Sequence, residues 1–168
     1  LKKGDKIEDL TLPSIDGTTF NLDSIKGKKA MISFYRYSSC PFCHLRMNEI
    51  INKTNEFGNN FVPIAIFDCD FDDLVKNSDI HDANMTILCD DDRVYFDKFE
   101  VQNNFFRFLL GITIRVDRFL RAIAKGYNPA SNMSGAFLGL PADILIDENG
   151  LVEKALYGAH TANHIPMK

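Results

Sequence analysis

The sequence lacks several features that would place it in a specialised class of protein. None of its apolar runs approaches the ~18 residues needed to span a bilayer, which excludes a transmembrane helix. Lys and Arg together number 19 against 23 for Asp and Glu, so the net charge of −4 gives no overall attraction to nucleic acid or to an anionic membrane. Four cysteines in 168 residues are too few for a disulfide-stapled secreted scaffold.

Internal repeats and low-complexity linkers are also missing from the chain. A length of 168 residues with 45% hydrophobic content fits one domain that buries an ordinary core, so we expect a single domain over residues 1–168. A cytoplasmic location is the expectation. Because the first residue is Leu1 rather than methionine, a periplasmic or exported location stays open.

What the chain does contain is a pair of closely spaced cysteines, Cys40 and Cys43, in the stretch SCPFCH. An apolar run at 30–35 predicts a central strand just before this pair. Pro41, apolar residues at helical spacing and Gly58 predict a helix just after it. A helix N-terminus has unpaired amide groups and the positive end of the peptide dipoles, so a thiolate at Cys40 is favoured there. Cys43 lies one turn further on, within reach to close a disulfide.

The remaining pattern indicates an α/β protein with a mixed sheet flanked by helices. Two strands at 9–12 and 18–22 around Asp16-Gly17 predict an N-terminal hairpin, and an apolar run at 61–67 completes a right-handed βαβ unit. A short strand is expected at 85–89 and a helix at 93–99. Residues 142–147 and 151–157, joined by an Asn-Gly turn, predict a final antiparallel hairpin.

A helical insertion is expected before this final hairpin. Residues 105–125 place apolar side chains on one helical face and basic ones on the other, and residues 126–139 read as a surface loop. A solvated face is the simpler reading of the basic side, with a partner-binding surface as its alternative. The excess of Phe on the apolar side leaves a homodimer contact open.

Together these motifs resemble the thioredoxin superfamily, and most closely the peroxiredoxin-like (AhpC/TSA-related) branch that keeps a CxxC. The similarity rests on the opening hairpin with its LPSIDG stretch, on FYR before SCPFC, and on LPADILIDENG before the end. It implies a thioredoxin-like fold and an antioxidant thiol oxidoreductase that reduces peroxides or disulfides without a cofactor. In this fold the proline that matches Pro141 is usually cis and faces the cysteine pair.

The sequence departs from typical peroxiredoxins at three positions. Those proteins place a Pro seven residues, and a Thr or Ser three residues, before the peroxide-attacking cysteine, where this chain has Ser33 and Tyr37. Pro141 stands where they carry an Arg that orients the peroxide. The resemblance therefore implies thiol redox chemistry more firmly than peroxide reduction.

In this reading Cys40 is the nucleophile and Cys43 resolves its product to a Cys40–Cys43 disulfide. An external thiol reductant of the thioredoxin or glutathione type then opens that disulfide. Arg36 and His44 are two candidate cations that lower the pKa of Cys40, and Arg36 is also a candidate donor to a substrate oxygen. The alternative for both side chains is a solvent-facing position.

Two non-enzymatic readings use the same cysteines. The pattern CxxCH also fits attachment of a c-type haem, which absorbance near the Soret band tests directly. A metal site needs two further ligands from the set Cys69, Cys89, His81, His160 and His164, but no second CxxC or HxxxH accompanies the first. Cys69 and Cys89 are expected to be small core side chains instead of redox partners.

Overall fold

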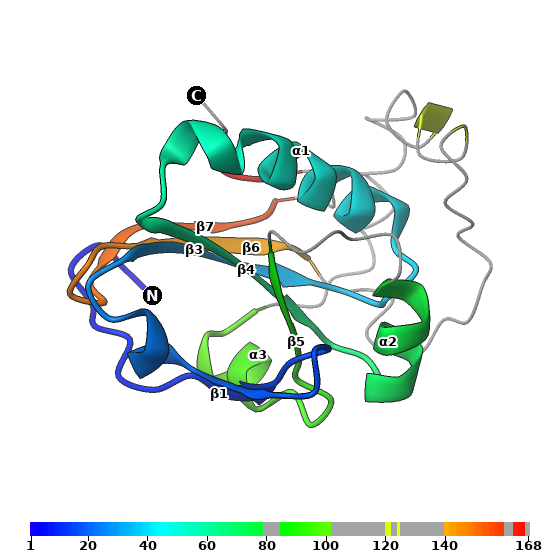
Figure 1. Cartoon of the computed structure of the whole chain (residues 1–168), viewed down its shortest axis with the longest axis horizontal. Coiled ribbons are helices and arrows are strands. Elements are labelled where there is room, and N and C mark those ends of the chain that lie inside the picture. The colour runs from blue at the N-terminus through cyan, green and yellow to red at the C-terminus, as the bar shows by residue number, and fades with distance from the viewer. Residues whose placement is uncertain (79–84, 102–119, 122–123, 125–139, 160–162, 167–168) are drawn as a thin grey trace.

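The computed structural model describes residues 1–78, 85–101, 120–121, 124, 140–159 and 163–166. Its centre is a five-stranded mixed sheet in the order β5-β4-β3-β6-β7 (Figure 1). These strands span, in chain order, β3 Lys29–Tyr35, β4 Phe61–Phe67, β5 Thr86–Cys89, β6 Ala142–Ile146 and β7 Val152–Tyr157. β3, β4 and β5 run parallel to one another, whereas β6 and β7 form an antiparallel hairpin that pairs with the other side of β3.

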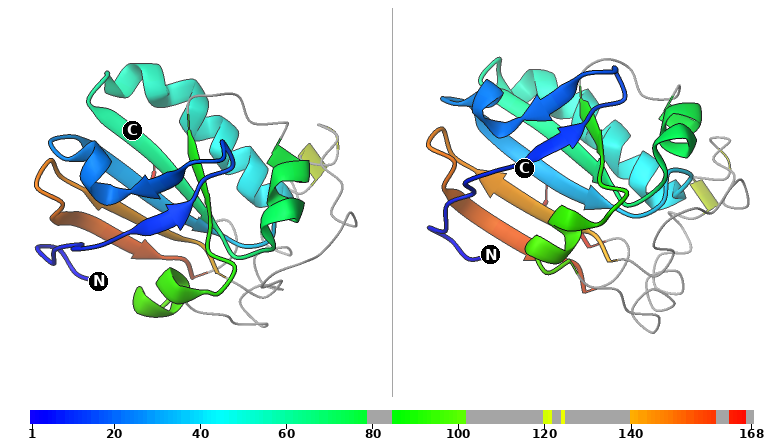
Figure 2. Two further views of the ribbon diagram at one scale, coloured as in Figure 1. Left: turned by 60° about the horizontal axis from the view of Figure 1, so that its bottom comes forward. Right: turned by 90° about the horizontal axis from the view of Figure 1, so that it is seen from below.

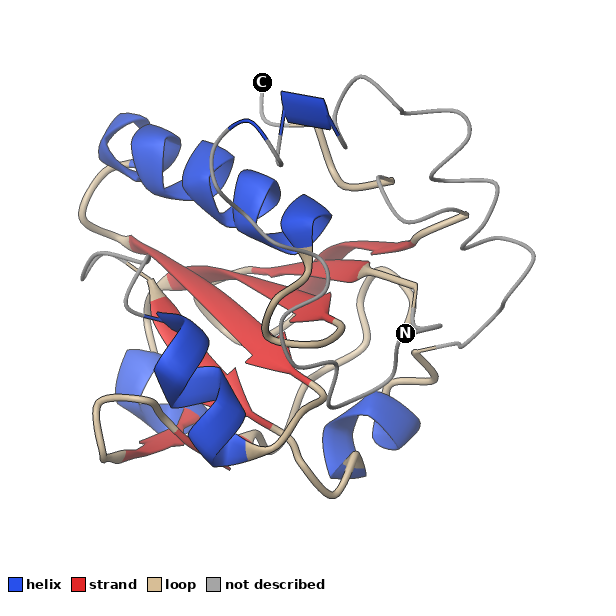
Figure 3. Cartoon of the chain, turned by 90° about the vertical axis from the view of Figure 1, so that its right-hand side faces the viewer, coloured by secondary structure: helices blue, strands red, loops and turns tan. Residues whose placement is uncertain are grey.

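Helices cover one face of this sheet, and a short hairpin covers the other. Helix α1 (Pro41–Phe57) lies lengthwise over the sheet, and α2 (Phe71–Ser78) follows β4 (Figure 3). On the opposite face lie the antiparallel hairpin of β1 (Thr11–Pro13) and β2 (Thr19–Asn21), the 3-10 helix η1 (Leu22–Ile25) and α3 (Val94–Lys98) (Figure 2). The sheet therefore separates two hydrophobic clusters.

Alternation along β3 assigns side chains to these two clusters. Ile32 and Phe34 point to the hairpin side, where Phe34 makes edge-to-face contacts with Phe96 and Phe99 at centroid distances of 5.0 and 5.5 Å. Tyr35 points to the helical side and shares its cluster with both cysteines of the CxxC pair. Burial on both faces explains why β3 is apolar almost throughout.

The predicted elements agree closely with the observed ones. The bounds of β4 and α1 are those expected, and α1 ends at Gly58, whose φ of +79° is a conformation that glycine adopts without strain. The first hairpin differs in its strands, which have three residues each, whereas the five residues between Pro13 and Thr19 give the loop its expected length. The Asp16 side chain supports this loop by accepting hydrogen bonds from the amide and hydroxyl of Thr18.

Two expectations fall largely beyond the part of the chain that the structure describes. Of the predicted amphipathic helix at 105–125, only residues 120, 121 and 124 are described, and the predicted loop at 126–139 lies wholly outside. Within the described ranges, no helix combines the length and apolar character needed to cross a membrane.

Candidate active site

The loop between β3 and α1 places the cysteine pair at the C-terminal end of the central strand. Cys40 caps the N-terminus of α1 and Cys43 lies in its first turn, which confirms the predicted position of the pair. Cys40 is 0% exposed and Cys43 is 4% exposed, and both are free thiols. The first amides of α1 and its dipole therefore favour negative charge at this position.

Arg36 supplies a positive charge directly at the Cys40 sulfur. Its guanidinium Nη2 donates to Cys40 Sγ at 2.9 Å, and the side chain is only 2% exposed. The guanidinium carbon also lies 5.5 Å from the ring centroid of Tyr37, a distance typical of a cation–π contact. The burial of its side chain shows that the alternative of a solvent-facing Arg36 is wrong. A buried charge needs a partner, and the Cys40 sulfur provides one.

These contacts give the two thiols opposite acid strengths. Burial by itself raises the pKa of Cys40, but hydrogen bonding from Cys43 and the charge of Arg36 outweigh it and lower that pKa to about 6. Burial raises the pKa of Cys43 well above its ordinary value, and its hydrogen bond to the Cys40 sulfur raises it further. At neutral pH the pair is therefore a Cys40 thiolate beside a protonated Cys43 thiol.

His44 has a different role from the one expected. Its side chain is buried, and its Nε2 lies 2.7 Å from the carbonyl oxygen of Ser38, so the neutral ring donates a hydrogen bond there. Burial lowers the pKa of His44 to about 4, which excludes a cationic His44 near neutral pH. The expectation that a cationic His44 lowers the pKa of Cys40 is therefore wrong. The alternative, a solvent-facing His44, is also wrong, because the side chain is buried.

Ser38 connects this loop to its surroundings. Besides accepting from His44, it accepts a hydrogen bond at its Oγ from Asn77 Nδ2 of α2 at 3.0 Å. The amide of Asp68, just after β4, donates to the carbonyl of Arg36 at 3.2 Å. Contacts from α1, α2 and the end of β4 therefore hold the segment that carries Arg36 and Cys40.

Pro141 lies at the same end of the sheet but differs from the expectation in one respect. β6 begins at the next residue, and Ala142 pairs with Phe34 of β3, so Pro141 lies close to where the strand leads into the cysteine loop. No cis peptide bond occurs among the described residues, which include Leu140 and Pro141, so the expected cis bond is not observed. Trans is the intrinsically preferred form of an X–Pro bond. Whether Pro141 acts in the reaction stays a prediction.

Cys69 and Cys89 are buried in the same cluster as the CxxC pair. The thiol of Cys89 donates to the carbonyl oxygen of Cys69 at 3.0 Å. Burial raises the pKa of Cys89 to about 11 and that of Cys69 still further, so both remain protonated thiols with little nucleophilic character. Among the described residues no group of three His, Cys, Asp or Glu side chains is arranged to hold a metal ion.

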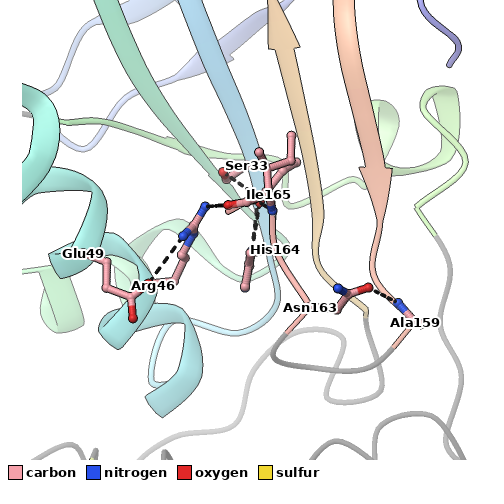
Figure 4. Close-up of polar contacts among 8 residues, drawn as sticks. Ser33, Arg46, Glu49, Ala159, Asn163, His164 and Ile165 are labelled. Carbon is pink, nitrogen blue, oxygen red and sulfur yellow. Dashed lines mark hydrogen bonds and ion pairs between the residues drawn. The ribbon is translucent and has the colours of Figure 1, made fainter. Parts of the chain in front are cut away.

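Sequence reasoning missed a buried polar network next to this site, shown in Figure 4. At its centre is Asp143 of β6, 0% exposed, which accepts hydrogen bonds from Ser33 Oγ at 2.8 Å and from the amide of Ile165 at 2.8 Å. His164 Nδ1 lies 3.1 Å from the same carboxylate, and Arg46 Nη2 lies 3.6 Å from it. Arg46 Nη2 also donates to the carbonyl of Ile165 at 2.6 Å, so α1 holds the C-terminal segment.

The charges in this network keep Asp143 ionised. Burial alone raises its pKa, but the charge of His164, its hydrogen bond and the charge of Arg46 together lower that pKa below its ordinary value. The only local hint in the sequence is a single Asp inside an apolar strand.

Comparisons with known proteins agree with this geometry. The model of the AhpC/TSA family matches residues 3–155. A search of curated protein sequences finds no match. Similar folds occur in the peroxidoxin BcpB from Mycobacterium tuberculosis, with a TM-score of 0.69 and 15% identity over 94% of this chain and 86% of that one.

Two further similar structures represent two kinds of thiol chemistry. One is a thiol peroxidase from Chromobacterium violaceum, with a TM-score of 0.66 and 16% identity over 97% of this chain and 80% of that one. The other is a putative thiol:disulfide interchange protein DsbE from Chlorobium tepidum, with a TM-score of 0.63 and 21% identity over 94% and 86% of the two chains. These likenesses show a thioredoxin-like fold.

Proposed function

Because the chain belongs to the AhpC/TSA family and is therefore a thiol-dependent oxidoreductase, we propose that it is a thiol peroxidase in which Cys40 attacks and Cys43 resolves. The observation that carries this proposal is the 2.9 Å contact between Arg36 and the Cys40 sulfur. It supports a thiolate at neutral pH, and the thiolate is the reactive form of cysteine. The low pKa of Cys40 and the high pKa of Cys43 support these two roles.

The first step consumes the peroxide. The Cys40 thiolate attacks one peroxide oxygen, the O–O bond breaks, and the other oxygen leaves with the electron pair and takes a proton to become water or an alcohol. Cys40 is oxidised to a sulfenic acid. Arg36 has further N–H groups, so it is suited to donate to the oxygen on which negative charge develops. Tyr37 stands at the position of the usual Thr or Ser, three residues before Cys40.

The second step resolves this product. The sulfur of Cys43 attacks the sulfenic sulfur, the S–O bond breaks, and the departing hydroxide combines with the Cys43 proton to form water. The resulting Cys40–Cys43 disulfide is returned to two thiols by an external dithiol or by two monothiols, of the thioredoxin or glutathione type.

Burial favours a hydroperoxide over a protein disulfide as the substrate. The Cys40 side chain is 0% exposed, and attack on a protein disulfide requires a partner sulfur atom to approach it along the S–S axis. A hydroperoxide of a few atoms needs a smaller opening. Thiol–disulfide exchange without peroxidase activity is the alternative that the experiment must separate.

Rapid mixing of the reduced protein with hydrogen peroxide, and separately with a model disulfide, tests the proposal. We expect fast loss of peroxide in the wild type, and no fast reaction in Cys40→Ser. Cys43→Ser should consume one equivalent of peroxide and then stop, with one added oxygen on Cys40 detected by mass spectrometry. Fast reaction with the disulfide but not with peroxide identifies an exchange protein instead.

Cys89→Ser is the matched control. It makes the same replacement at another buried cysteine, and the new hydroxyl keeps the hydrogen bond to Cys69. We expect wild-type rates with both oxidants. If Cys40→Ser reacts with both oxidants as fast as this control, Cys40 is not the nucleophile.

A further inference from the structure

His44 is a buried polar side chain that the proposed chemistry does not use. It is the fourth residue of α1 and is only 3% exposed. Its backbone amide donates to the carbonyl of Cys40 at 3.1 Å, and its ring Nε2 lies 2.7 Å from the carbonyl oxygen of Ser38. One helical residue therefore binds the preceding chain at two points, at the helix cap and inside the loop.

The part of the loop that His44 binds is a tight turn. The amide of Cys40 donates to the carbonyl of Tyr37 at 3.2 Å, which closes a four-residue turn over residues 37–40. Ser38 is the first of the two central residues of this turn and is only 1% exposed. A buried carbonyl needs a donor, and the ring of His44 supplies one. The hydrogen bond therefore fixes the central peptide of the turn.

This hydrogen bond requires a neutral ring with its proton on Nε2. A carbonyl oxygen only accepts hydrogen bonds, so Nε2 of His44 must be the donor. Burial lowers the pKa of His44 to about 4, whereas the pKa of Cys40 is about 6. The ring is therefore neutral at every pH at which Cys40 is largely a thiolate.

The same turn sets the separation between Arg36 and the Cys40 sulfur. Arg36 directly precedes the turn and Cys40 ends it, and Nη2 of Arg36 lies 2.9 Å from Sγ of Cys40. The amide of Asp68 donates to the carbonyl of Arg36 at 3.2 Å, which holds the backbone at the start of the loop. Because the attraction between two charges weakens as they separate, the stability of the thiolate depends on the shape of this turn.

We propose that His44 is a positioning residue for Cys40: by fixing the turn at 37–40, its ring holds the Cys40 sulfur against the guanidinium of Arg36. The inference rests on the proposed attacking role of Cys40. His44 takes no proton from the thiol and gives none to the substrate. It keeps the thiolate beside its counter-charge, so the neutral ring acts on Cys40 indirectly, through the loop.

The test is the pH dependence of iodoacetamide alkylation at Cys40 in His44→Phe, resolved by mass spectrometry. This variant keeps a flat ring in the helix but has no donor for Ser38. The midpoint should move upward by about 0.5–1 unit, because a looser turn weakens the effect of the opposite charge without removing it. In His44→Gln the side-chain amide replaces the Nε2 donor, so the midpoint should return to the wild-type value.

A second variant and a control separate the hydrogen bond from general damage. His44→Asn is one methylene shorter than His44→Gln, so its amide falls short of Ser38 and its midpoint should rise as in His44→Phe. Thr54→Val is the matched control. Thr54 Oγ1 donates to the carbonyl of Ile50 at 2.9 Å further along α1, so the variant also removes a bond from a side chain to a carbonyl of this segment. Its midpoint should stay at the wild-type value.

A double variant tests whether the effect passes through Arg36. Arg36→Gln removes the charge that the turn holds against the sulfur. Adding His44→Phe to Arg36→Gln should therefore leave the midpoint where Arg36→Gln alone places it, because coupled residues give non-additive changes. A further rise as large as that caused by His44→Phe in the wild type contradicts the proposed route.

The outcomes separate this inference from the proposed function. If His44→Phe and His44→Asn lose stability in urea but titrate at the wild-type midpoint, His44 is purely structural and the inference is refuted, while the role of Cys40 stands. A midpoint in His44→Gln as high as that in His44→Phe also refutes it. If Cys40→Ser consumes peroxide as fast as the wild type, the proposed function itself fails, and that measurement does not involve His44.

Discussion

At the scale of single residues, the reactivity of Cys40 depends on its contact with Arg36. The thiolate fraction should rise as the pH passes about 6 and level off above it, because the pKa of Cys40 is lowered to that value. Arg36→Gln removes the charge and the donor at 2.9 Å, so the midpoint should move upward by about 1–2 units. The measurement is the pH dependence of iodoacetamide alkylation at Cys40, resolved by mass spectrometry.

Lys29→Gln is the control for that shift. Lys29 begins β3 at the opposite end of the strand and forms an exposed pair with Glu153, so its loss changes the net charge equally without touching the site. Its midpoint should stay at the wild-type value. A midpoint that moves as far in this variant as in Arg36→Gln contradicts a local effect.

The unpaired hydroxyl of Tyr35 leads to a stability prediction at the same scale. Tyr35→Phe removes a buried donor that has no partner, so the free energy of unfolding should stay level or rise by up to about 2 kcal/mol. Tyr95→Phe removes a hydroxyl that accepts from the amide of Thr11 and donates to Asp9, and should cost about 1 kcal/mol. Urea unfolding measures both. A loss in Tyr35→Phe as large as that in Tyr95→Phe argues against an unpaired Tyr35.

At the scale of elements, α1 was the most predictable part of the molecule because its signals are local. A Pro at the first position, apolar residues at helical spacing and Gly58 after the last turn are all visible in the sequence, and the observed bounds match them. The neutral state of His44 was not predictable, because it depends on burial against Ser38. The strands of the first hairpin are shorter than predicted, whereas the loop around Asp16, whose side chain accepts hydrogen bonds from Thr18, has the expected length.

His44 makes the junction between α1 and the preceding loop sensitive to acid. Its folded pKa of about 4 lies below its ordinary 6.5, so the unfolded chain binds a proton first as the pH falls. The free energy of unfolding should therefore decrease from about pH 6.5 to about pH 4 by about 3 kcal/mol on account of this residue. His44→Gln keeps a donor for Ser38 but does not titrate. Urea unfolding across this range should show a steeper loss in the wild type, and parallel curves would contradict the prediction.

At the scale of the whole molecule, Asp143 joins parts of the chain that are distant in sequence. Through Ser33, Arg46 and the segment at His164 and Ile165, it connects β6 with β3, α1 and the C-terminal segment. No local pattern signals such a network, since its members contribute one residue each from separate elements. The fold class and the cysteine pair follow from short motifs, whereas this network appears only once the sheet has been assembled.

Removal of the Asp143 charge tests how much this connection contributes. Asp143→Asn leaves Arg46 and His164 without their buried carboxylate, so the free energy of unfolding at neutral pH should fall by about 3 kcal/mol. Because the folded pKa of Asp143 is below its ordinary value of 3.8, its stabilisation is present above that pH and is lost as the pH falls through the lower value. The difference in free energy of unfolding between wild type and Asp143→Asn should thus be constant down to about pH 4 and shrink below it.

Asp23→Asn, at an exposed position, is the control and should change the free energy of unfolding by no more than about 0.5 kcal/mol. Equal small losses in both variants at neutral pH would show that the network does not hold the C-terminal segment to the sheet.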